Sequence, residues 1–267
     1  TKLSFETPML FQTVLFCIAA VFAAIISIRF IFPRGLEATS VDRLSGFLIA
    51  GAPIAVLAVL SVLHARGSLE LAWLFSTEET GAGPIEYGTV LFFLMACGLS
   101  FLIARADQTM MRFAYIGLGA ACFLIAGEEL SWGQWIFHWE TLEALAEVNL
   151  QQETNIHNLV NPRLYDPIYA VAGFALIAMC AASVLGGARR WLSARADMPV
   201  VGEIAAFTDW LGVARFGLVL TLSTAVLLQH ESFEEYSEVM LSLTLALFLM
   251  HRLRMVSASA GQFAPAE

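Results

Sequence analysis

Seven stretches of the chain are each about 20 residues long and mostly apolar, and no other feature restricts the fold as strongly. They lie at 9–32, 44–65, 84–106, 113–137, 167–188, 204–229 and 233–253. A helix needs about 20 apolar residues to cross the ~30 Å hydrocarbon layer of a bilayer. Because lipid offers no hydrogen-bond partners to an open backbone, such runs fold as helices. The sequence therefore predicts an all-α fold, with one polytopic helix bundle over 1–267 and about seven transmembrane helices.

The composition supports this class and excludes two others. Hydrophobic residues make up 58% of the chain and charged residues only 14%, whereas a soluble domain keeps roughly a quarter of its residues charged. A formal net charge of -9 repels phosphate, so nucleic acid is excluded as a partner. The run 9–32 is too long for the apolar region of a signal peptide, so we expect it to be a retained span.

The positive charges predict the orientation. Eleven of the fourteen Lys and Arg residues fall at or next to the connections between predicted spans one and two, three and four, and five and six, or near the C-terminus. The positive-inside rule places these segments in the cytoplasm, with the N-terminus outside and the C-terminus inside. Sixteen of the 23 acids then lie outside. We therefore expect a multi-pass protein of the cell inner (plasma) membrane with an acidic outer, periplasmic face.

The segment Gly127–Gln134 reads GEELSWGQ and puts two adjacent acids, Glu128 and Glu129, inside the predicted span 113–137. If that helix continues to Phe137, Glu128 lies about nine residues from its outer end, or roughly 13 Å along it at ~1.5 Å per residue. An ionised carboxylate at that depth costs at least ~2.5 kcal/mol, which makes it a candidate functional group. We interpret Glu128 and Glu129 as candidate catalytic acids.

Helical spacing predicts where Glu128 points. The residues that share its helical face are Gly117, Ala121, Leu124 and Trp132. Small residues mark surfaces where membrane helices pack, so we expect Glu128 to face the bundle interior. The alternative is a structural role, in which protonated Glu128 donates a hydrogen bond to a neighbouring helix.

The last predicted span carries more acids. Glu231, Glu235, Glu238 and Ser242 form one polar stripe, and Ser232 to Glu235 has capping-box spacing that would start the helix early. Like charges at this spacing repel one another unless they are protonated or share a cation. We predict that Glu128, Glu235 and Glu238 line one outer-face cavity.

The outer connection 138–166 is the longest polar stretch. It contains a predicted short helix with Thr141 as N-cap and Glu143 in its first turn. Glu153 and His157 would lie on one face if helical, a spacing suited to a divalent cation such as Zn, Mn or Fe. We therefore predict a metal site whose ligands are Glu153, His157, Glu235 and Glu238.

The sequence Glu128-Glu129-x-x-Trp132 resembles the start of the EExxF/W-Arg motif of the CAAX-protease and bacteriocin-processing family of intramembrane proteases. The resemblance is confined to this short motif, and Gly133 stands where the family has Arg. It implies that Glu128 activates a water molecule with help from histidines on later segments. The pair GEExSWGQ and LQxExNxHN is also similar to a pair in polytopic bacterial membrane proteins, which implies no particular chemistry.

Three functional readings remain open. In the first, the carboxylate and histidine site is a metal-dependent hydrolase for a lipid or membrane-protein substrate. In the second, the chain is a non-catalytic subunit of a larger membrane complex, and its acidic face docks a basic partner. In the third, the same acids form a proton or cation pathway.

Overall fold

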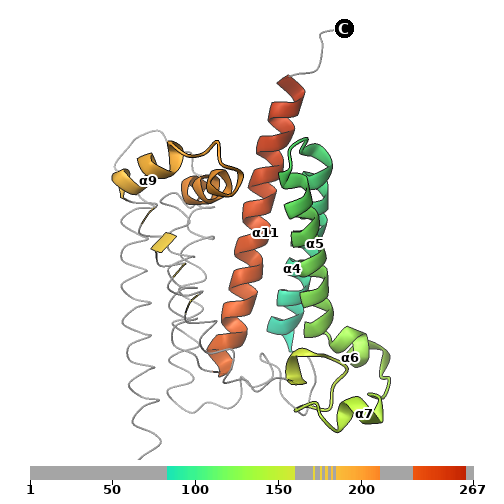
Figure 1. Ribbon diagram of the computed structural model, residues 1–267. Helices are drawn as coiled ribbons and strands as arrows, with labels where there is room; N and C mark the ends of the chain where they lie inside the picture. The colour runs from blue at the N-terminus through green and yellow to red at the C-terminus, as the bar shows by residue number, and fades with distance from the viewer. Residues whose placement is uncertain are drawn as a thin grey trace, which may run out of the picture. The chain divides into compact units, whose positions relative to one another are not determined.

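The computed structural model describes residues 83–159, 185–210 and 231–262, with a few isolated positions between 171 and 182. The predicted spans 9–32 and 44–65 lie outside these residues, and so do most of 167–188 and the second half of 204–229. All regular structure in the described ranges is helical (Figure 1). The chain divides into two compact units, Leu71–Tyr165 with Glu235–Glu267 and Thr1–Glu70 with Asp166–Glu234, which we treat separately.

The first of these units is built on an antiparallel pair of helices, α4 (Pro84–Ala106) and α5 (Met111–Glu129). Proline suits the first turn of α4, and the Glu86 carboxylate accepts the Gly83 N–H at 3.1 Å. The Asp107 carboxylate then accepts the Thr109 N–H at 2.6 Å in the connection to α5. These short-range bonds fix where α4 begins and where the chain turns back.

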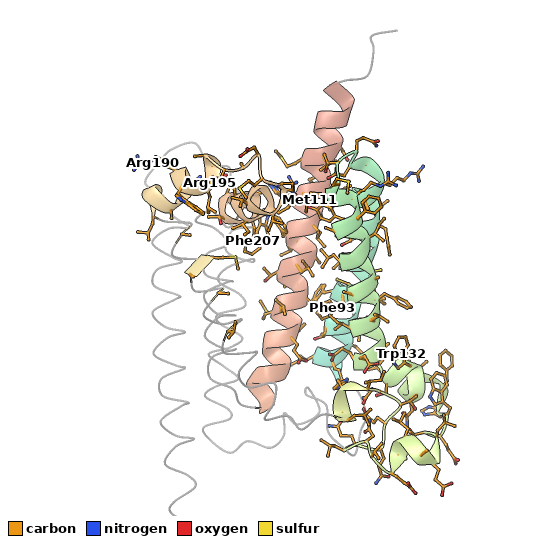
Figure 2. All side chains as sticks on the ribbon, in the orientation of Figure 1. Phe93, Met111, Trp132, Arg190, Arg195 and Phe207 are labelled. Carbon is orange, nitrogen blue, oxygen red and sulfur yellow. The ribbon has the colours of Figure 1, made fainter. Side chains whose placement is uncertain are left out.

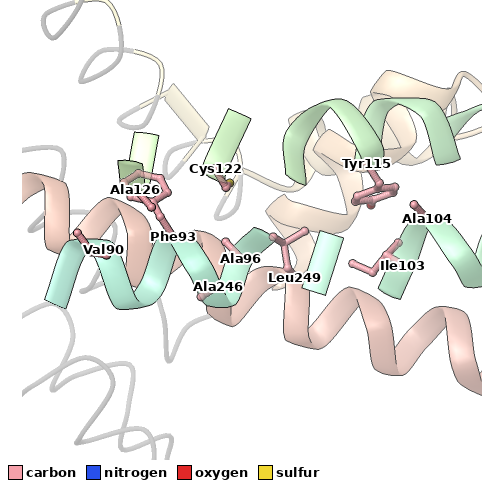
Figure 3. Close-up of a cluster of buried hydrophobic side chains, with 10 residues drawn as sticks. All are labelled: Val90, Phe93, Ala96, Ile103, Ala104, Tyr115, Cys122, Ala126, Ala246 and Leu249. Atoms are coloured by element: carbon pink, nitrogen blue, oxygen red, sulfur yellow. The ribbon is translucent and has the colours of Figure 1, made fainter. Parts of the chain in front are cut away.

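A third helix, α11 (Glu231–Gln262), packs against this pair, as Figure 1 shows. Figure 3 shows the shared core, in which side chains of all three helices are buried. Its members are Val90, Phe93, Ala96, Ile103, Ala104, Tyr115, Cys122, Ala126, Ala246 and Leu249. Four of the ten are alanines, which lets the helix backbones approach closely, as in membrane bundles.

Three helical segments among the described residues are long and apolar enough to cross a membrane: Ile85–Ala106, Met111–Glu129 and Glu238–Ser257. The first matches the predicted span 84–106, which is confirmed as a helix of that length. The third lies within α11, which also contains positions 235 and 238, so the prediction that both glutamates are on the helix is confirmed. Cys122 is almost fully buried in the core, as expected of an apolar packing residue.

The predicted helix 113–137 is wrong at its outer end, because α5 ends at Glu129. Ser131, Trp132 and Gly133 all have positive φ, at 45°, 56° and 92°, and this left-handed run cannot continue a right-handed helix. Glu128 therefore occupies the last turn of α5 and does not lie deep along a longer helix.

The predicted packing face of α5 is wrong as well. Gly117, Ala121 and Leu124 are exposed, whereas Tyr115, Gly119, Cys122 and Ala126 are buried. A Cβ on Gly119 would lie 3.1 Å from the Phe101 ring of α4, so the two helices pack closely at this position. The sequence offered two faces with small residues, and the position of α4 selected the other one.

The described part of the second unit consists of α9 (Gly186–Ser193), a turn, and a helix over 199–210. Leu185 is extended, with φ -86° and ψ 104°, so α9 is a separate helix. The predicted span 167–188 therefore ends too late, because two glycines follow Leu185 and favour a break there. Leu192, Ala205 and Trp210 are the buried apolar side chains of this part.

Candidate functional site

The candidate site begins where α5 stops, in the segment 131–159 that we call the cap. The left-handed run Ser131–Gly133 turns the chain away from the axis of α5 and leads into the one-turn helix α6 (Gln134–Phe137). Gly133 adopts its φ of 92° without steric penalty. The positive φ values of Ser131 and Trp132 do carry a penalty, so other contacts must stabilise this conformation. Those contacts come from the second half of the cap.

Trp132 folds back over the last turn of α5, where Figure 2 labels it. Its ring packs edge-on against Phe123 at 6.4 Å between centroids, and its Nε1–H donates to Glu128 Oε1 at 2.7 Å. The ring also covers Gly127, where an added Cβ would lie 2.8 Å from it. Glycine at position 127 is thus required by the close approach of the indole.

The other carboxylate oxygen of Glu128 reaches across to the distant part of the cap. Oε2 accepts the backbone N–H groups of Ile156 at 2.6 Å and His157 at 3.0 Å, at the start of the 3-10 turn η4 (His157–Leu159). The His157 Nδ1 atom lies 3.6 Å from the same oxygen. The Glu128 carboxylate thus accepts three N–H donors and lies beside an imidazole.

The Glu153 carboxylate also accepts several hydrogen bonds within the cap. Its Oε2 accepts the Ser131 hydroxyl and the Asn155 amide, both at 2.7 Å, with the Asn158 amide at 3.4 Å. Asn155 also donates to Ser131 Oγ at 3.0 Å, and its side chain is only 1% exposed. These contacts bind the left-handed run at Ser131 to the second half of the cap.

Two amides complete the arrangement. The Asn149 side-chain Oδ1 accepts the backbone N–H groups of Gln151 and Glu153, both at 3.0 Å, and its Nδ2 donates to Asn155. The Gln134 side-chain Oε1 accepts the backbone N–H of Thr154 at 2.7 Å. The segments GEELSWGQ and LQQETNIHN are therefore folded onto each other, mainly through their polar side chains.

The predicted short helix exists as α7 (Glu143–Ala146), but its predicted N-cap residue, Thr141, is wrong by one residue. Leu142 is the N-cap and makes no side-chain hydrogen bond to the helix. The Thr141 hydroxyl does not cap the helix because it donates to Gln134 Oε1 at 3.2 Å and lies 3.1 Å from Thr154 Oγ1. The tertiary contact has taken the hydroxyl that the sequence assigned to the helix.

The surface of the cap is largely apolar and acidic. Exposed apolar side chains next to the Glu128 contacts are Trp132, Ile156 and Leu159. The Phe137 and Trp139 rings stack with centroids 5.5 Å apart and are also exposed. The exposed acids are Glu140, Glu143 and Glu147. The Glu128 and His157 pair is thus bordered by apolar side chains.

The structure brings some of the predicted site residues together and keeps others apart. Glu128 and His157 are brought together, with side-chain exposures of 18% and 44%. Glu129 is the last residue of α5 and is half-buried. Residues 153–156 are not helical, so Glu153 and His157 do not share a helical face, and Glu153 instead contacts Ser131.

The metal ligands remain only partly placed. The side chain of Glu235 lies outside the described residues, so the cavity that would join Glu128, Glu235 and Glu238 stays a prediction. Among the described side chains, no three His, Cys, Asp or Glu groups are close enough to hold a metal ion. Sequence reasoning also missed Ser131, Gln134, Asn149 and Asn155, although their polarity next to apolar spans was a usable signal.

Comparison of the chain with protein-family models, curated proteins and solved structures found no match.

We predict that Gly127→Ala destabilises the unit, because its Cβ would lie 2.8 Å from the Trp132 ring and displace it from Glu128. Overpacking of this kind typically costs about 1–3 kcal/mol. Thermal unfolding in detergent should show a lower midpoint. Gly117→Ala is the matched control on α5, because nothing lies within 4 Å of its added Cβ. A Gly127→Ala midpoint equal to that of the control would contradict the packing role.

Proposed function

We propose that this chain is a multi-pass inner-membrane hydrolase with about seven spans, in which His157 acts as general base and acid on the outer side of the membrane and Glu128 orients it. The substrate would be a lipid ester. The observation that carries this proposal is the 3.6 Å approach of His157 Nδ1 to Glu128 Oε2, with the imidazole exposed and apolar side chains around it.

The charge distribution of the helical unit supports an outer location for the cap. Arg105 and Arg112 lie at the far ends of α4 and α5, and the Arg252 Nε atom is 3.5 Å from the Tyr115 hydroxyl near the same end. The cap itself contains no Lys or Arg. By the positive-inside rule, the end that carries the arginines is cytoplasmic and the cap is outside.

The proposed chemistry follows from which nitrogen faces the carboxylate. A proton on Nδ1 would point towards Glu128 and leave Nε2 as the base. Nε2 would then accept the proton of a water molecule as its oxygen attacks the ester carbon, and return that proton to the alcohol that leaves. Glu128 would keep its charge, orient the ring and stabilise the transient imidazolium. Separations in free enzymes commonly exceed hydrogen-bond distance and shorten with substrate.

The test is hydrolysis by the protein reconstituted in vesicles of phosphatidylethanolamine and phosphatidylglycerol, with lyso-lipid and free fatty acid measured by mass spectrometry. His157→Asn should reduce product formation about 100-fold or more, because a neutral amide cannot accept the proton. The matched control is His138→Asn, an exposed histidine of the same cap at φ 56°, where Asn is tolerated. Wild-type protein that releases no more product than empty vesicles would refute lipid hydrolysis.

Metal dependence is tested on the same preparation. We expect the pair to act without a metal, so hydrolysis should survive dialysis against EDTA. Elemental analysis that finds stoichiometric Zn, Mn or Fe, together with loss of activity in EDTA, would instead favour the site with Glu153, Glu235 and Glu238 as further ligands.

A second candidate function has its own supporting observation. The carboxylates of Glu128 on α5 and Glu153 in the cap are both occupied by hydrogen bonds that hold the cap together, as expected of a rigid docking surface in a non-catalytic subunit. In that case the exposed acids Glu140, Glu143 and Glu147 would bind a basic partner. Their triple change to Gln should then release a co-purifying protein, and the complex should weaken as salt rises past ~0.15 M. Hydrolysis retained by the triple variant would favour the enzyme.

A further inference from the structure

A second surface of interest lies on α9 and the turn that follows it. Leu192 is the buried side chain of this short helix, whereas its neighbours Arg190 and Trp191 are exposed. Arg195, in the turn, is exposed too and is labelled with Arg190 in Figure 2. We call Arg190, Trp191 and Arg195 the α9 basic surface.

Side-chain contacts join α9 to the helix that follows it. Arg189 donates to Asp209 Oδ1 through Nη2 at 2.7 Å and through Nε at 3.2 Å, which joins α9 to the helix 199–210. A Cβ on Gly202 would lie 2.7 Å from the Ala196 carbonyl oxygen, so the second helix packs tightly against the turn. These contacts occupy Arg189 and present the basic surface on a defined scaffold.

Within the surface, a cation is placed over an aromatic ring. The Arg195 guanidinium lies 4.5 Å from the centroid of the Trp191 ring, and its Nη1 donates to the Trp191 carbonyl oxygen at 3.3 Å. Arg190 is the adjacent residue along α9. The arrangement puts one guanidinium group over an exposed indole, with a second exposed arginine next to that tryptophan in the chain.

Apolar side chains surround these cations. Leu185, Met198 and Val200 are all more than half exposed, and they precede and follow the basic surface in the chain. Exposed apolar groups together with arginines and a tryptophan are typical of elements that lie in the membrane–water interface. This segment follows the predicted span 167–188, and a span there would bring it to a bilayer surface.

We propose that the α9 basic surface binds the phosphate headgroups of anionic phospholipids, with Trp191, Met198 and Val200 in the interfacial layer. Guanidinium groups pair with phosphate oxygens through two parallel hydrogen bonds, and the positive charge distinguishes anionic from zwitterionic lipid. The proposal is independent of hydrolysis at the cap.

The test uses the full chain reconstituted in phosphatidylcholine vesicles that contain one-fifth phosphatidylglycerol. Electron paramagnetic resonance measures how strongly the protein immobilises spin-labelled phosphatidylglycerol relative to spin-labelled phosphatidylcholine. The wild type should favour phosphatidylglycerol. Each arginine removed in R190Q/R195Q should weaken the binding of phosphatidylglycerol at the α9 basic surface by about fivefold, which lowers the measured preference. The preference of the wild type should also fall as salt is raised.

The matched control is R112Q/R254Q, which removes two exposed arginines from α5 and α11. We expect it to keep most of the preference. Equal losses in both double variants would show a general charge effect and overturn the assignment to α9, as would an unchanged R190Q/R195Q protein. Circular dichroism and elution volume check that the variants are folded. A dimer of wild type that R190Q/R195Q disperses would assign the surface to a second copy of the chain instead.

Discussion

Glu128→Gln is expected to release the 150–158 part of the cap from α5 while α4, α5 and α11 stay packed. A glutamine accepts through one oxygen only, so its NH₂ group would face N–H donors that now bind a carboxylate. Hydrogen bonds to charged groups contribute about 1.5–3 kcal/mol each and neutral ones about 0.5–1.5 kcal/mol, so losing at least one bond outright and making the others neutral removes roughly 3 kcal/mol. Amide exchange at Ile156 and His157 should then accelerate about 100-fold or more.

Hydrogen exchange measured by mass spectrometry on protein in nanodiscs would reveal this change. Glu143→Gln is the control, because Glu143 is an exposed acid of the same cap. If exchange across 150–158 were the same in the Glu128→Gln variant as in wild type, Glu128 would not hold the cap. Loss of hydrolysis in that variant follows from either role of Glu128, so His157→Asn is the variant that tests the chemistry.

Asn155→Leu should disrupt the cap even more. The leucine has a similar size but makes no hydrogen bonds, so the buried partners Ser131, Asn149 and Glu153 each lose one. A buried polar group left without its partner costs about 1–3 kcal/mol, and more when it is charged. The summed penalty of roughly 3–9 kcal/mol exceeds what a small segment can absorb, so we expect the cap to unfold locally.

The measurements are the same exchange experiment and the thermal midpoint in detergent. Asn158→Leu is the matched control: Asn158 is less buried, and its amide donates to Gln151 at 2.5 Å and only distantly to Glu153. We expect faster exchange across 131–158 for Asn155→Leu and a smaller, more local effect for the control. Equal effects of the two changes would mean that Asn155 does not organise the cap.

The two variants also separate the functional readings. A rigid cap is needed both for an oriented His157 and for a docking surface, so both activities should fail when it unfolds. Only the acid–base proposal requires the imidazole itself, because the His157 N–H that binds Glu128 belongs to the backbone. An asparagine at position 157 keeps that bond and removes the base.

The sequence by itself determined the helical class and much of the helix placement in the described residues. Hydrophobic runs of membrane length predicted α4 almost to the residue, and Ser232 to Glu235 predicted that α11 extends past its apolar part. Both follow from local chemistry, since the length of a span and the start of a helix depend on neighbouring residues. The two polar motifs were also visible as polar stretches, and Glu128 and His157 were selected from them.

Only the tertiary structure decided what those motifs do. The left-handed run after α5 is not favourable on its own, and contacts of Ser131 with Glu153 and Asn155, more than 20 residues away, support it. Those contacts ended α5 at Glu129, so Glu128 lies in the last turn of that helix and not nine residues inside a longer one. The packing face of α5 was likewise set by α4. Periodicity shows which residues share a face, but the free energy of packing against a particular neighbour selects the face that is buried.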